Sequence, residues 1–422
     1  MSALSNIIYK INSKLSSQFL RNLGWLGMAE IVSRIFRLGL TTVILPRLLT
    51  KYDYGLAAIV LTVHEFTRIF IEVGVTTKII QSKEDELSDL CNSGYWLNWI
   101  VFPGLFIVQC IVAFPVSWFY HDSHLVLPIC VVAMSYLTLP MGTTQYALIV
   151  RENKLKICAI VNTFKYITAY VLSAIFAVLE MGVWAFVLPW VFVTPIEMLI
   201  YRIIHPWHPP NSLTTKYWKD ILNFGKSMLG VQLLKTLRNN LDYLIVGRFL
   251  GVEVLGIYFF GFNAGLGVSL SIISAINTAT LPHLCASHTS LQELKKSYFS
   301  VIKIISIIII PLVFLQSTLA HLYVPLLQGN KWIVAIPILV LICLSAIPRP
   351  FADAASQLLV TIGKPDLDLR WNILFTAMFT IAVFIGVHWN AIGVATSVLL
   401  VHIIFLPLFT SWVTRYVFRT TT

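Results

Sequence analysis

Residues 301–315 read VIKIISIIIIPLVFL, a stretch in which Lys303 and Ser306 are the only polar side chains. A second run, residues 373–387, reads ILFTAMFTIAVFIGV and is apolar in the same continuous way. Strands of an outer-membrane barrel would instead alternate apolar and polar residues. A helix satisfies its own backbone hydrogen bonds in lipid. These runs therefore predict membrane-spanning helices and an all-α membrane protein.

The composition of the whole chain agrees with these two runs. Of its 422 residues, 57% are hydrophobic and 12% are charged, whereas a soluble domain has about 25% charged residues. This excludes a soluble enzyme, a disordered chain and a fibrous repeat. The net charge of +11 is typical of basic cytoplasmic loops, so we expect no nucleic-acid partner.

Motifs for catalysis, metals and cofactors are lacking. The six cysteines form no CxxC pair, so we predict neither a zinc site nor a disulfide framework. The sequence has no GxxxxGK phosphate loop, which argues against ATP-driven transport. We therefore expect no catalytic residue, no metal and no cofactor, with coupling to an H⁺ or Na⁺ gradient or to the membrane potential.

The hydrophobic pattern predicts twelve spans of about 20 residues or more. They are expected at 23–46, 54–80, 92–117, 124–150, 157–179, 181–204, 221–247, 254–281, 297–323, 332–361, 368–388 and 390–414. The polar stretch 205–220 separates them six and six. The predicted parts are an amphipathic interfacial segment (1–22), an N-lobe (23–204), a cytoplasmic linker (205–220), a C-lobe (221–416) and a cytoplasmic tail (417–422).

The distribution of basic residues predicts the orientation. With the N-terminus inside, nineteen of the 30 lysines and arginines fall in inner segments and four in outer loops. Because basic residues favour the cytoplasmic side, both termini are expected in the cytoplasm.

The two halves of the chain align when the sequence is shifted by 201 residues. Glycines and arginines coincide at Gly24/Gly225, Arg37/Arg238, Arg47/Arg248 and Gly55/Gly256. Further on, Pro140 lies opposite Pro348. Six spans per half give both halves the same direction, which predicts two six-helix lobes related by a parallel repeat. Transporters of this architecture bind substrate between the repeats.

Charged residues fall inside the predicted spans, where each costs at least about 2.5–3.5 kcal/mol at mid-bilayer. The basic ones are Arg34, Arg37, Arg68, Lys165, Lys235, Arg238 and Arg349. The acidic ones considered with them are Glu30, Glu65, Glu72, Asp242 and Asp353. Such residues normally face protein or a water-filled cavity.

Two interpretations of these charges are open. Neutralisation within a helix would pair residues one turn apart, as in Glu30–Arg34, Arg238–Asp242 and Arg349–Asp353. Three cations, namely Arg37, Lys165 and Lys235, have no acidic residue one turn away. We therefore favour a basic inward-facing cavity over purely structural pairing, and guanidinium groups suit phosphate oxygens.

Other polar residues inside the spans have two interpretations each. His64, beside Glu65, is either a proton carrier or, as we favour, an interior histidine with its hydrogen bonds satisfied. Asn263 and Asn277 either line the pathway or bond a neighbouring helix.

Short motifs in both halves carry a resemblance to a known family. They are RLLT at 47–50 with DYGL at 53–56, LDYLIVGRFLG at 241–251 with LGIY at 255–258, Gly74 with IIQ at 79–81, and WLN at 96–98. The chain resembles the polysaccharide transporter family of the multidrug/oligosaccharidyl-lipid/polysaccharide exporter superfamily.

The resemblance implies a MATE-like bundle and a Wzx-type flippase for O-antigen or exopolysaccharide. Such proteins move an undecaprenyl-diphosphate-linked oligosaccharide across the bacterial inner membrane, with a polysaccharide polymerase, glycosyltransferases and membrane lipids as partners. Related lipid II flippases carry central arginines for the diphosphate, in spans comparable to those of Arg34, Arg37, Arg68, Lys235 and Arg238. The alternatives are a drug or metabolite antiporter of the same superfamily and, less favoured, a membrane polysaccharide polymerase or ligase.

Overall fold

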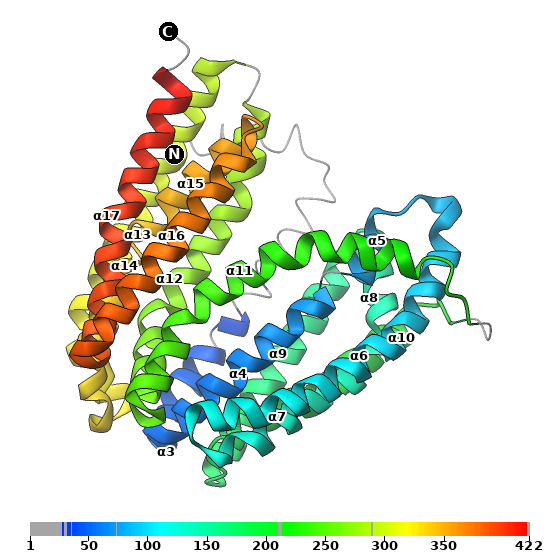
Figure 1. Cartoon of the computed structure of the whole chain (residues 1–422), viewed down its shortest axis with the longest axis horizontal. Helices are drawn as coiled ribbons and strands as arrows, with labels where there is room; N and C mark the ends of the chain where they lie inside the picture. Colours follow the sequence, from blue (N-terminus) through cyan, green and yellow to red (C-terminus); the bar gives the residue numbers. More distant parts are fainter. Residues whose placement is uncertain are drawn as a thin grey trace. The chain divides into compact units, whose positions relative to one another are not determined.

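The computed structural model consists of helices and short connections throughout the part of the chain that it describes (Figure 1). That part comprises Met28 and residues 32–34, 36–72, 74–209, 213–287 and 290–419. No strand occurs among these residues, which confirms the predicted all-α class. The predicted interfacial segment 1–22, Glu30 and the side chain of Glu72 lie outside the described residues.

The chain divides into two compact units whose bounds differ from those of the predicted lobes, and the division into lobes and linker stays a prediction. Unit 1 contains Met1–Leu49 and Val60–Leu237, and unit 2 contains Thr50–Ile59 and Arg238–Thr422. The chain therefore passes between the units inside two helices, α4 (Lys51–Glu72) and α11 (Trp218–Leu250), and not at the predicted linker 205–220.

Contacts at the start of α11 explain why this helix begins in unit 1. The Trp218 indole Nε1 donates a hydrogen bond to the Ser93 carbonyl at 2.9 Å, and the Tyr217 backbone N–H donates to Ser93 Oγ at 3.2 Å. Ile221 is buried in a hydrophobic cluster with Val75 and Leu90. Residues 217–221 are thus fixed to unit 1 before α11 continues into unit 2.

Unit 1 contains several short helices between its long ones. In chain order its other helices are η1 (Arg37–Ile44), α3 (Leu45–Leu48), α5 (Val75–Gln81), α6 (Glu84–Tyr120), η2 (Ser123–Leu125), α7 (Val126–Ala133), η3 (Met134–Leu137), η4 (Leu139–Met141), α8 (Thr143–Arg151), α9 (Leu155–Val178) and α10 (Trp184–Ile204). The predicted span 124–150 is not one continuous α-helix, since α7 ends at Ala133 and the short helices η3 and η4 follow before α8.

Unit 2 is built mainly from long helices. They are α12 (Val252–Ala286), α13 (Leu291–Tyr323), η5 (Val324–Gln328), η6 (Asn330–Ala335), α14 (Ile336–Ser345), α15 (Arg349–Thr361), α16 (Pro365–Gly386), η7 (Val387–Trp389) and α17 (Asn390–Arg419). Helices α16 and α17 lie side by side, and α14 contacts both α12 and α17 (Figure 1). The α14–α15 break falls at Pro348, the residue that the repeat alignment places opposite Pro140.

The apolar surfaces of the long helices identify the chain as a multi-pass membrane protein. Seven helical segments are long and apolar enough to cross a membrane: Glu84–Tyr120, Ser123–Met141, Leu155–Val178, Trp184–Ile204, Leu291–Gln328, Asn330–Thr361 and Pro365–Phe418. The last of these contains both α16 and α17. The number of crossings, twelve, stays a prediction, as does the internal repeat.

The recurring motifs of the two halves meet at a close helix crossing within unit 2. A Cβ atom on Gly55 would lie 1.9 Å from the carbonyl oxygen of Val252, and one on Gly256 would lie 1.8 Å from that of Lys51. The shift of 201 residues relates 51 to 252 and 55 to 256, so the contact is reciprocal. A repeat with this offset would produce such a reciprocal crossing.

The first of these motifs also starts its helix. The Thr50 backbone N–H donates to Asp53 Oδ2 at 2.9 Å, and the Asp53 N–H donates to Thr50 Oγ1 at 3.1 Å. This reciprocal pair is a capping box with aspartate in the third helical position. The residues of RLLT and DYGL therefore begin α4 and bring its first turn against α12.

Gly256→Ala is expected to destabilise the protein by about 1–3 kcal/mol, because the new methyl group would overlap a backbone carbonyl that cannot move alone. Thermal unfolding of the purified protein in detergent measures the effect. Gly104→Ala in α6 is the matched control, since no atom outside its own helix lies within 4 Å of its Cβ position. Equal melting temperatures for the two variants would contradict the close crossing.

Candidate functional site

Lys165 and Glu197 form an ion pair near the middle of two apolar helices of unit 1. The distance from Lys165 Nζ on α9 to Glu197 Oε1 on α10 is 2.9 Å, and the side chains are 17% and 10% exposed. Spacing along α9 offers Lys165 no acidic partner, and the structure supplies one from the next helix. The charge of Lys165 is therefore compensated by Glu197, and its role in phosphate binding stays a prediction.

His64 belongs to a hydrogen-bonded network in unit 1. Its ring stacks on that of Tyr136 at 4.9 Å between centroids, and its Nδ1 lies 2.8 Å from the Tyr136 hydroxyl. That hydroxyl donates to Gln109 Oε1 at 2.9 Å, and Gln109 Nε2 donates to the Ile129 carbonyl at 2.9 Å. The Nδ1 contact agrees with the interpretation of His64 as an interior histidine, which stays a prediction together with the proton-carrier alternative.

Besides Lys165, four of the predicted cations lie in unit 1, whereas Arg238 and Arg349, which are also half-buried, lie in unit 2. Arg34 and Arg37 are half-buried, while Arg68 and Lys235 are exposed, as is Glu65. Four residues of α11, namely Gln232, Lys235, Asn239 and Asp242, follow one another at spacings of three or four and therefore share a helical face. Contact between such a polar helical face and lipid is unfavourable. Lys235 is the exposed, positively charged residue of this face.

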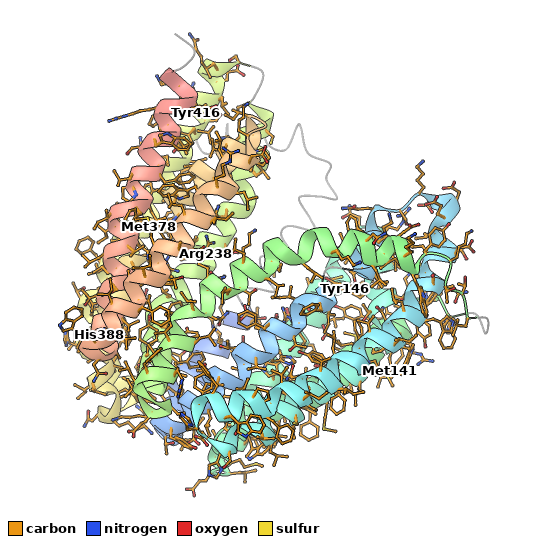
Figure 2. All side chains as sticks on the ribbon, in the orientation of Figure 1. Met141, Tyr146, Arg238, Met378, His388 and Tyr416 are labelled. Carbon is orange, nitrogen blue, oxygen red and sulfur yellow. The ribbon has the colours of Figure 1, made fainter. Side chains whose placement is uncertain are left out.

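In unit 2 the predicted Arg238–Asp242 pair is replaced by contacts to other helices. Arg238, labelled in Figure 2, donates from Nη1 to Asn372 Oδ1 on α16 at 2.5 Å. Asp242 is 2% exposed and accepts bonds from the Tyr258 hydroxyl at 2.8 Å and the Tyr243 N–H at 3.0 Å. No ion pair joins Arg238 to Asp242 in the described part of the chain.

The predicted Arg349–Asp353 pair is likewise absent among the described ion pairs. Asp353 Oδ2 accepts a bond from Asn277 Nδ2 at 2.7 Å, so Asn277 bonds a neighbouring helix, whereas Asn263 bonds its own helix at the Phe259 carbonyl. Among the described residues, Arg349 donates a long bond from Nη2 to Ser345 Oγ, 3.4 Å. Its buried Nε has no hydrogen-bond partner among the described residues.

Arg349 lies among other charged side chains of unit 2. Asp242 and Asp353 attract it electrostatically and Arg238 repels it, while Asp353 and Asp368 both act on Arg238. Cations and carboxylates are thus mixed in this part of unit 2, and phosphate binding by the cations of either unit stays a prediction.

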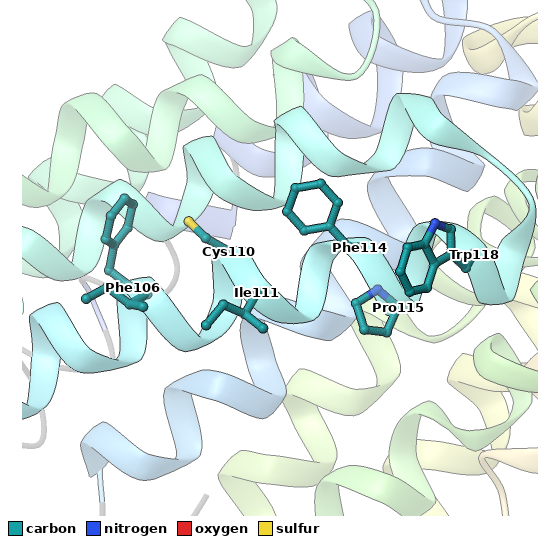
Figure 3. A pocket seen from close by; sticks show the side chains of 7 residues that line it. Phe106, Cys110, Ile111, Phe114, Pro115 and Trp118 are labelled. Atoms are coloured by element: carbon teal, nitrogen blue, oxygen red, sulfur yellow. The ribbon is translucent and has the colours of Figure 1, made fainter.

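An apolar hollow of about 440 Å³ lies along α6 and contains none of these charges (Figure 3). It is lined by Phe106, Ile107, Cys110, Ile111, Phe114, Pro115 and Trp118. Ile111 and Trp118 are 61% and 72% exposed. A hollow of this composition on one helix suits hydrocarbon and offers nothing to a phosphate or a sugar.

The chain is similar in sequence to a known protein family and to bacterial proteins of known name. A family model described as "Polysaccharide biosynthesis protein" matches residues 44–337. The chain is 25% identical over 396 residues to an "Uncharacterized membrane protein in cps region" of Klebsiella pneumoniae, covering 92% of this chain and 80% of that protein. It is also 25% identical over 391 residues to "Lipopolysaccharide biosynthesis protein WzxC" of Escherichia coli strain K12, covering 90% and 77%.

Two solved structures share the fold. One is the lipid II flippase MurJ in an inward closed conformation, with a TM-score of 0.75, 12% identity and coverage of 92% of this chain and 87% of that chain. The other is an inward-facing multidrug resistance MATE family transporter of the MOP superfamily, with a TM-score of 0.63, 13% identity and coverage of 93% and 94%. The predicted MATE-like fold is confirmed.

Proposed function

The chain belongs to the polysaccharide biosynthesis protein family, and we propose that it is a flippase for an undecaprenyl-diphosphate-linked oligosaccharide. In this proposal it moves the O-antigen or exopolysaccharide repeat unit across the bacterial inner membrane by alternating access, with both termini in the cytoplasm. The names of two similar proteins, a lipopolysaccharide biosynthesis protein and a lipid II flippase, support the class of cargo.

The observation that carries this proposal is the exposed Lys235 on the polar face of α11. Helix α11 is not among the segments apolar enough to cross a membrane unaided, so its polar face needs protein or water beside it. A cation held there can attract a lipid diphosphate. Arg34, Arg37 and Arg68 belong to the same unit and add positive charge.

Coupling is proposed to use an H⁺ or Na⁺ gradient or the membrane potential, because the chain has no nucleotide-binding loop. Translocation makes and breaks no covalent bond, so the proposal assigns no catalytic residue. A polysaccharide polymerase and glycosyltransferases are the expected partners, since they make and use the lipid-linked cargo.

A flipping assay with purified protein tests the function directly. Proteoliposomes would carry undecaprenyl diphosphate with one N-acetylglucosamine and a fluorescent group that an impermeant reductant destroys. We expect the protein to expose the inner-leaflet lipid, so that the fluorescence protected in empty liposomes is lost.

The same proteoliposomes test the antiporter alternative with a fluorescent organic cation. Movement of the dye while the lipid stays protected would reject the flippase in favour of a drug or metabolite antiporter.

A further inference from the structure

Helices α9 and α10 carry aromatic side chains on the sides that lie away from their exposed apolar residues. The exposed apolar residues of α9 are Ile160, Phe164, Val171, Ile175 and Val178. Their spacings of four, seven and eleven residues place them on one helical face. Lys165 and Tyr166 lie more than about 100° around the helix from the centre of that face.

Helix α10 has the same two-sided composition. Its exposed residues include Phe192, Ile196 and Ile203, whereas Trp190, Glu197 and Tyr201 are spaced by seven and four residues on the opposite side. Because α9 and α10 pack along each other, these two sides belong to one wall of unit 1. Tyr166, Tyr170 and Trp190 on this wall are only half-buried.

Aromatic rings on this wall lie beside the ion pair and contact one another. Tyr166 and Tyr170 are stacked, with 6.3 Å between centroids and 20° between planes, and Tyr166 meets Trp190 edge-on at 6.3 Å. The Lys165 ammonium lies 5.1 Å from the centroid of Tyr166. Tyr201 is 1% exposed, and its hydroxyl has no hydrogen-bond partner among the described residues.

We propose that this wall, comprising Lys165, Tyr166, Tyr170, Trp190 and Glu197, binds the sugar of the lipid-linked cargo. The proposal rests on the proposed flippase function. The C–H face of a pyranose carries partial positive charge and suits the negative face of an aromatic ring. Its hydroxyl groups suit the donors of the ammonium and the lone pairs of the carboxylate that the ion pair leaves unused.

The charge of the wall distinguishes a sugar from other ligands. Lys165 and Glu197 neutralise each other at 2.9 Å, so a phosphate would meet a carboxylate and a cationic drug would meet an ammonium. A neutral ligand with several hydroxyl groups is repelled by neither the carboxylate nor the ammonium. Apolar surfaces with a few fixed polar groups are also the usual composition of small-molecule sites.

The test compares lipids with and without sugar on the purified full-length protein. Native mass spectrometry would measure binding of bare undecaprenyl diphosphate and of the same lipid carrying one glucose, galactose or N-acetylglucosamine. We expect at least one glycosylated lipid to bind about tenfold more tightly than the bare lipid. Tyr166→Leu or Trp190→Leu should remove this preference and leave binding of the bare lipid unchanged.

Two matched variants separate ring stacking from folding. Tyr166→Phe keeps the ring and should keep most of the preference, while Phe164→Leu changes an aromatic residue on the lipid-facing side of α9 and should have no effect. Equal binding of bare and glycosylated lipids by the wild-type protein, or a preference that survives Tyr166→Leu and Trp190→Leu, would overturn the sugar site alone. Failure of the wild-type protein to bind any of the lipids would overturn the flippase function as well.

Discussion

Lys235→Ala is expected to lower the rate of lipid flipping ten- to a hundredfold while leaving the amount of folded protein in the membrane unchanged. A hydrogen bond to a charged group contributes about 1.5–3 kcal/mol, which corresponds to that range of rates. Lys235 is exposed and forms no ion pair within the described part of the chain, so removing it leaves no buried charge behind. The fluorescent proteoliposome assay gives the rate.

Two further variants make this prediction specific. Lys226 lies nine residues earlier on α11, half a turn out of phase with Lys235, and is also exposed, so Lys226→Ala should flip lipid normally. Arg37→Ala should fail as Lys235→Ala does, and Arg37→Lys should recover part of the rate, since an ammonium cannot hold phosphate in a bidentate way. Full activity of both Lys235→Ala and Arg37→Ala would reject phosphate binding by these cations.

The positions of the helices follow closely from hydropathy, because lipid requires long apolar runs. Where a helix begins at a residue other than the one hydropathy predicts, local interactions explain the difference. Helix α6 begins at Glu84 and not near residue 92, since three acidic residues in its first turn interact favourably with the helix dipole. The hydropathy pattern could not show that α11 begins in unit 1, because that depends on contacts of Trp218 with a distant helix.

The charged residues of the site were identified from the sequence, but most of their partners were not. Spacing along one helix predicts contacts one turn apart, as for Arg238 and Asp242. In the structure each finds a closer partner across a helix interface, at Asn372 and Tyr258. Single polar residues inside apolar runs, such as Gln109, indicate in the sequence that hydrogen bonds between helices exist. Their positions along the chain do not show which helices are in contact.

Arg349 provides the second large effect, and here the expected loss is of folding. Replacing it by methionine removes a positive charge that attracts both Asp242 and Asp353 inside unit 2. Breaking such a buried charge set costs about 3–5 kcal/mol. We therefore expect little Arg349→Met protein in the membrane fraction, measured by immunoblot and by the melting temperature of what remains.

A double-mutant cycle shows whether Arg349 acts through Asp242. If Arg349 serves to neutralise that carboxylate, Asp242→Asn should restore part of the protein level lost in Arg349→Met, because the stranded negative charge is gone. Arg370→Met is the control, since Arg370 is exposed on α16 and its loss should change neither level nor melting temperature. A stable Arg349→Met protein that cannot flip lipid would instead place Arg349 among the substrate ligands, because a guanidinium needed for folding cannot be lost without loss of the fold.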